Sequence, residues 1–126
     1  MRSRSLALLL TTLLLAGCPS RGPDPWEENA GVYEARLGAP GTQQRIVTLW
    51  LDEGGTARLE TVYVGKARGP LDEGRWSATG SDISVTLNDA SEPLVFRRVG
   101  KELLPESWDR TRYGSEGLLL QRRWPR

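Results

Sequence analysis

Apolar and polar residues alternate with a two-residue period along most of the chain after Trp26. In the clearest case Ile83, Val85 and Leu87 fall on one face of an extended segment, and the residues between them are polar. Alternation of this kind is typical of a strand with one buried face, and no long stretch keeps the spacing of an amphipathic helix. The pattern therefore predicts β-structure with a single buried face per strand.

The same pattern predicts about eight short strands separated by turns. Their expected ranges are 31–37, 47–51, 57–63, 74–78, 83–88, 94–99, 103–104 and 117–122. Gly54 and Gly55 lie in one of the turns, where glycine supplies the positive φ that hairpins require. We predict an all-β fold, a small antiparallel barrel with meander order, because closure removes exposed strand edges. The residues expected to point inward are Val47, Leu49, Leu51, Leu59, Trp76, Ile83, Val85 and Leu87.

The first 17 residues have the layout of a secretory signal peptide. Arg2 and Arg4 precede an apolar run over 6–15, and small residues follow. The run is too short for a membrane-spanning helix, which needs about 20 apolar residues. We divide the chain into a signal peptide at 1–17, a Pro-rich tether at 18–25, and one barrel domain at 26–126.

The end of this signal, Leu15-Ala16-Gly17-Cys18, resembles the lipobox of bacterial lipoproteins. We expect cleavage before Cys18 and acylation of its sulfur and of the new N-terminus, which holds a protein on a bilayer because each buried methylene contributes about 0.8 kcal/mol. The alternative is an ordinary signal peptide followed by a buried cysteine. Pro19, in the position where Asp marks retention in the inner membrane of enteric bacteria, favours the outer membrane, with the domain facing the periplasm.

The amino-acid composition argues against most kinds of catalytic and metal-binding site. The chain has 126 residues, a formal net charge of +1, no His, one Cys and one Met. We expect no catalytic residues, no cofactor and no metal site, and hence no enzyme, because imidazole and thiol chemistry are missing. The balanced charge gives no support for nucleic-acid binding.

Segments from Gly31 to about residue 122 resemble the N-terminal domain of NlpE, an outer-membrane lipoprotein associated with copper resistance and envelope-stress sensing. The resemblance lies in 31–37, 47–52, 55–57, 63–66 and 73–76, which includes a Gly-x-Trp at Gly74 and Trp76. It implies a barrel akin to lipocalins and a sensing or adaptor role.

This sequence departs from that family between the first two strands. The family typically has a Cys-x-x-Cys there, whereas the stretch from Gly38 to Gln44 contains no cysteine. Cu(I) prefers thiolate and thioether ligands. The family's copper or thiol role is therefore not expected in this chain.

A few surface residues are candidates for binding. Trp50 lies on the face opposite Val47, Leu49 and Leu51, where an indole can anchor a partner; the alternative is that the tether or the C-terminal segment covers it. Carboxylate pairs at 27–28, 52–53 and 72–73 are expected to be solvated turn charges rather than a calcium site. The basic ending 122–126 is expected to be a frayed tail rather than a phosphate-binding segment.

Three functions stay open at this point. The first is an envelope lipoprotein that senses or adapts, held on the membrane by its lipid and contacting a periplasmic or envelope protein. The second is a lipocalin-like carrier of a small apolar ligand, because eight-stranded barrels can be filled or hollow. The third is a binder or inhibitor of a periplasmic protein that uses Trp50. The sequence leaves the oligomeric state open.

Overall fold

The computed structural model describes residues 28–38, 44–66 and 68–125. Several predictions concern residues outside this description: the signal peptide 1–17, Cys18, the tether 18–25, Trp26 and most of the 38–44 stretch. The predictions made for them stay predictions.

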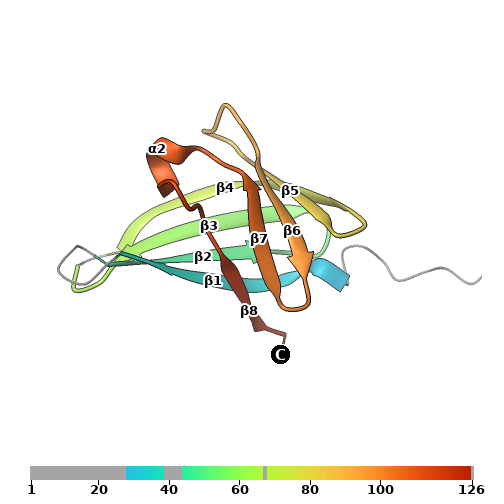
Figure 1. Ribbon diagram of the computed structural model, residues 1–126, viewed down its shortest axis with the longest axis horizontal. Helices are drawn as coiled ribbons and strands as arrows, with labels where there is room; N and C mark the ends of the chain where they lie inside the picture. The colour runs from blue at the N-terminus through green and yellow to red at the C-terminus, as the bar shows by residue number, and fades with distance from the viewer. Residues whose placement is uncertain (1–27, 39–43, 67, 126) are drawn as a thin grey trace, which may run out of the picture.

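Eight antiparallel strands form a closed barrel in which each strand pairs with its neighbours in the chain and β1 pairs with β8 (Figure 1). The strands are β1 Gly31–Leu37, β2 Arg45–Leu51, β3 Thr56–Tyr63, β4 Arg68–Thr79, β5 Asp82–Leu87, β6 Leu94–Val99, β7 Glu102–Ser107 and β8 Leu120–Trp124. The predicted fold class and meander order are confirmed. Pairing of the first with the last strand leaves no open sheet edge.

The barrel interior is occupied by side chains from all eight strands. Every residue expected to point inward is buried, at 3% exposure or less. The other buried apolar residues on the strands are Tyr33, Ala35, Ala57, Leu94, Phe96, Leu103 and Leu120. Alternate residues of an antiparallel strand point to opposite faces, so one two-residue pattern defines both core and surface.

Only β1 and β6 have the predicted bounds, and β4, β7 and β8 differ from theirs by three residues or more at one end. β4 begins six residues earlier than expected, at Arg68 rather than at residue 74. β8 runs to Trp124, so the expectation of a frayed tail from residue 122 is wrong. The reason is that β8 closes the barrel against both β1 and β7, and its backbone groups are therefore paired up to its end.

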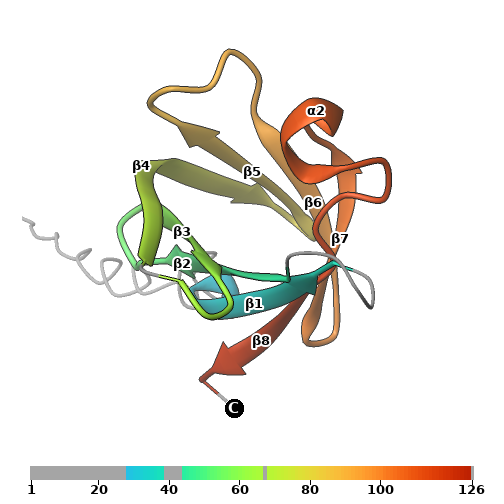
Figure 2. The same ribbon diagram turned by 90° about the vertical axis from the view of Figure 1, so that its left-hand side faces the viewer.

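A four-residue helix, α2 (Arg110–Tyr113), follows β7 and was not predicted. The Asp109 side chain caps it by accepting hydrogen bonds from the backbone N–H groups of Thr111 and Arg112. The helix lies at the end of the barrel opposite the start of β1, and Figure 2 views the molecule from that side. Its last residue, Tyr113, is buried. Among the residues described, no helix is long and apolar enough to cross a bilayer.

Candidate functional site

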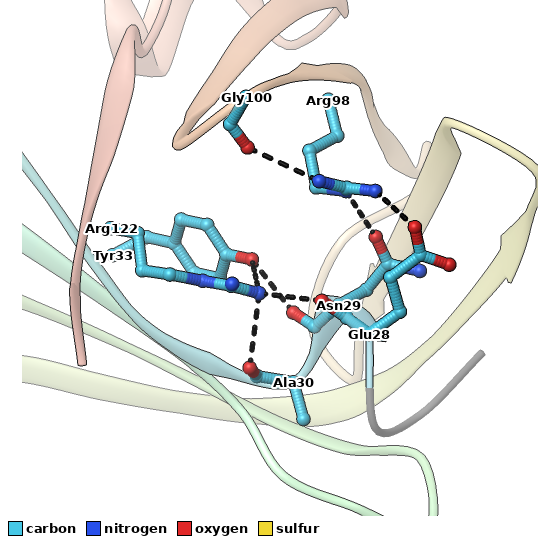
Figure 3. A network of polar contacts seen from close by, with 7 residues as sticks. All are labelled: Glu28, Asn29, Ala30, Tyr33, Arg98, Gly100 and Arg122. Atoms are coloured by element: carbon cyan, nitrogen blue, oxygen red, sulfur yellow. Dashed lines mark hydrogen bonds and ion pairs between the residues drawn. The ribbon is translucent and has the colours of Figure 1, made fainter. Parts of the chain in front are cut away.

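Two arginines hold the entry of the chain into the barrel. Arg98 comes from β6 and Arg122 from β8, and both contact residues 28–30, directly before β1 (Figure 3). We call the contacts among Glu28, Asn29, Ala30, Arg98 and Arg122 the arginine clamp.

Arg122 forms the inner half of the clamp. Its Nη2 donates to the backbone oxygens of Glu28 at 2.7 Å and Ala30 at 3.3 Å, and to the hydroxyl of Tyr33 at 2.9 Å. That hydroxyl in turn donates to the backbone oxygen of Asn29 at 2.7 Å. Burial raises the pKa of Tyr33, and the positive charge of Arg122 opposes this rise only in part. The tyrosine therefore stays neutral and keeps its proton for Asn29.

Arg98 forms the outer half. Its Nε donates to Oδ1 of Asn29 at 2.7 Å, and its Nη2 lies 2.5 Å from Oε1 of Glu28. Its Nη1 donates to the backbone oxygen of Gly100 at 3.2 Å. Charge-assisted bonds of this kind are stronger than neutral ones. The clamp thus joins the segment before β1 to two strands that lie far from it in the sequence.

Replacing Arg122 with methionine is expected to lower the free energy of unfolding by about 1 to 3 kcal/mol, because the Tyr33 hydroxyl and two carbonyls lose their donor. Urea unfolding at neutral pH measures the change. Arg123→Met is the matched control: Arg123 is about half exposed and makes a 3.5 Å ion pair with Glu34 on the surface. Exposed pairs contribute about 0 to 1 kcal/mol. Equal losses in the two variants would contradict a structural role for the clamp.

Trp50 lies on the outer wall of the barrel, as its position in the pattern predicted. It pairs in register with Val32 of β1 on one side and with Arg58 of β3 on the other. The Arg58 guanidinium lies 5.1 Å from the centre of the indole ring, a cation–π distance. The indole is half-buried between these neighbours. Its role as an anchor for a partner remains a prediction.

Trp124 extends this wall by one strand. It pairs with Val32 and is 66% exposed. We call Trp124, Val32 and Trp50, which stand side by side on β8, β1 and β2, the aromatic row. Sequence reasoning missed Trp124 because the ending 122–126 was expected to be a frayed tail, and alternation from Leu118 and Leu120 would in any case place Trp124 on the inner face. A register shift between Val32 and Tyr33 turns it outward.

The opposite end of the barrel contains a second polar cluster, beneath α2. Arg112 of α2 forms an ion pair with Asp72 of β4, whose side chain is only 11% exposed. The Nη1 of Arg45 donates to the backbone oxygen of Arg112 at 3.2 Å. The expectation that Asp72 is a solvated turn charge is therefore wrong: it lies within a long strand, on the same face as Trp76. These contacts hold α2 against the barrel.

A pocket of about 300 Å³ lies between α2 and the connection from β5 to β6. Its lining includes the carboxylates of Asp89, Glu92 and Asp109 and the buried ring of Tyr113. Burial raises the pKa of Tyr113, whose hydroxyl has no hydrogen-bond partner among the described residues. Within the same residues, no group of three or more His, Cys, Asp or Glu side chains is arranged to hold a metal ion.

The fold is a closed, eight-stranded meander barrel whose interior is filled, with polar clusters at both ends and an aromatic row on the wall. No protein-family model matches the sequence, and no curated protein matches it. The chain is similar in structure to a "putative lipoprotein" from Shewanella oneidensis, with 22% identity and a TM-score of 0.49, over 75% of this chain and 89% of that one. This likeness assigns no activity to the chain.

Proposed function

We propose that this protein is a lipid-anchored lipoprotein of the bacterial envelope with a non-enzymatic sensing or adaptor role, of the kind that the NlpE resemblance implies. The sequence Leu15-Ala16-Gly17-Cys18 supports the anchor, and Pro19 favours the outer membrane. The absence of His from the chain, together with the proposed acylation of its single Cys, supports a non-enzymatic role.

The observation that carries the adaptor role is the filled interior. Tyr33 and Phe96 are buried to 1% exposure or less, among the leucines and valines of the neighbouring strands. A carrier of the lipocalin kind needs space along the barrel axis for its ligand, and here side chains occupy it. The pocket beside α2 has four charged residues among the nine that line it, which disfavours a purely apolar ligand. Recognition is therefore expected on the outer wall and at the ends.

The arginine clamp supports the same role. The tether 18–25 contains three prolines and spans about 20 Å when extended as polyproline II. Because the clamp fixes residues 28–30 to β6 and β8, a force or displacement at the tether acts on the whole barrel rather than on one strand. This is a useful property for a protein that reports its position relative to a membrane.

The test compares the wild-type chain with Cys18→Ser and with the nearby control Ser20→Ala. Wild type and the control are expected to begin at Cys18, to carry acyl mass on intact-mass analysis, and to partition into detergent. Cys18→Ser is expected to be soluble or to keep its signal peptide. An unmodified thiol on a soluble mature chain would end the proposal of an anchor.

The sensing role is tested by overproducing the same three chains in an envelope-stress reporter strain. The reporter is expected to respond to the wild-type chain and to Ser20→Ala, and to respond far less to Cys18→Ser at matched protein level. A response that does not depend on Cys18 would contradict a role for the anchored barrel, while leaving the anchor itself intact.

A further inference from the structure

We propose that the aromatic row is a membrane-contact surface, with Trp124, Val32 and Trp50 seated in the headgroup region of the bilayer that holds the lipid anchor. The inference rests on the proposed anchor and adds to it which face of the barrel meets the lipid. Its occupant is a lipid surface, and neither a soluble protein nor the chain's own tether.

The first step is the position of the row. Gly31 pairs with Leu51, and the next residue, Val32, pairs with both Trp50 and Trp124. The row therefore lies at the end of the barrel where the chain enters, while α2 lies at the other end (Figure 1). A groove of about 270 Å³ runs beside Trp124, between Pro125 and the end of β2.

The second step is the chemistry of the row. Trp124 has 66% of its surface exposed, more than any other large apolar residue in the described part of the chain. Indole combines an apolar body with one polar N–H, and tryptophan is enriched at membrane interfaces for this reason. The Arg58 guanidinium lies over the Trp50 ring, and a guanidinium beside a membrane-facing indole can bind a lipid phosphate.

The third step is the charge around the row. Arg58 and Arg123 are close to it, and so are Asp52 and Glu34, with which they form ion pairs at 3.5 Å. Glu53 also lines the groove beside Trp124, so basic residues are not in excess here and this surface does not select anionic lipid. Zwitterionic lipid is therefore expected to suffice, with contact driven by the indoles.

The fourth step is the reach of the chain. Residues 19–27 separate the proposed anchor at Cys18 from Glu28, which the clamp fixes to the barrel. Ten steps of extended chain span at most about 35 Å. An anchor this close brings the entry end of the barrel to the bilayer and leaves the α2 end pointing away. In this orientation the exposed indole of Trp124 faces the bilayer.

The experiment places the acylated full-length protein in phosphatidylcholine vesicles whose chains are brominated near the headgroup, and measures quenching of tryptophan fluorescence against unbrominated vesicles. All chains carry Trp26→Phe, because Trp26 is close to Cys18 in the sequence and could be quenched in any orientation of the barrel. Trp124→Phe removes the exposed indole of the row. Trp108→Phe is the matched control, because Trp108 lies beside α2, where its Nε1 donates to the Gly114 oxygen at 2.8 Å. Urea midpoints verify that both variants fold.

Bromolipid is expected to quench the parent chain, and Trp124→Phe is expected to lower the quenched fraction at least two-fold, while Trp108→Phe leaves it unchanged or raises it. A chain that floats with the vesicles but is not quenched would overturn the membrane contact and leave the anchor standing. Equal quenching in both variants would overturn the assignment to the row. A chain that does not float at all would instead refute the proposed function. If Trp124 is shielded from aqueous iodide without any bromolipid quenching, the tether or a second copy covers the row, and the proposal fails.

Discussion

Replacing Gly74 with alanine is expected to lower the free energy of unfolding by about 3 kcal/mol or more, at the upper end of what overpacking does. Gly74 is buried in β4 opposite Leu87 of β5. A methyl group added there would lie 2.7 Å from the Cα of Leu87 and closer still to the carbonyl oxygen of Thr86. Both are backbone atoms of a paired strand, so no side chain can rotate away to make room. The strands themselves have to separate.

Chemical denaturation of Gly74→Ala measures the effect, and Ser77→Ala on the same strand is its control. Ser77 is exposed and pairs with Ser84 across β4 and β5. Its loss is expected to stay within about 0.5 kcal/mol, as for most surface changes. A Gly74→Ala chain as stable as the control would mean that β4 and β5 do not approach as closely as described.

Truncating Leu49 to alanine is expected to cost about 2 to 5 kcal/mol, the range for a buried leucine whose cavity does not refill. Leu49 is fully buried in β2 and lies between Tyr33 of β1 and Leu59 of β3 in the pairing register. Typical domains have only about 5 to 15 kcal/mol of stability in total. The expected loss is therefore a large share of the total, and thermal unfolding measures it as a lower midpoint.

The control for this change is the identical truncation at Leu71, which is 50% exposed on β4. Leu71→Ala is expected to shift the thermal midpoint by far less, because removal of the side chain leaves little cavity and takes away little buried apolar area. Similar shifts at Leu49 and Leu71 would mean that the barrel wall is buried on both faces.

Alternation predicted the barrel and its core well because one periodicity governs both. The same alternation, followed back from Trp76 along β4, also places Asp72 on the inner face. We instead expected a turn there, because Asp72 is followed directly by a second acidic residue, Glu73. The partner of Asp72, Arg112, lies 40 residues further on. No local pattern predicts a contact that depends on how the chain folds around the end of a barrel.

The arginine clamp was missed for a related reason. Arg98 shares a face with Phe96, and Arg122 shares one with Leu120, so both are inward positions of their strands. From sequence alone an arginine is expected on the surface. A buried guanidinium needs hydrogen-bond acceptors, and these come from segments that are distant in the sequence. Here most of the acceptors belong to residues 28–30, as side-chain oxygens for Arg98 and as backbone oxygens for Arg122, and no local sequence pattern marks them as partners of these arginines.

The pairing of β1 with β8 also determines when the barrel can close during synthesis of the chain. The seam between β7 and β8 consists of only two register pairs, Glu102 with Gln121 and Leu103 with Leu120, so β8 is held mainly by β1, some 90 residues earlier in the chain. Contacts between distant segments form slowly. A nascent chain therefore cannot complete this barrel until β8 has been synthesised, and until then both β1 and β7 lack the partner that closes the sheet.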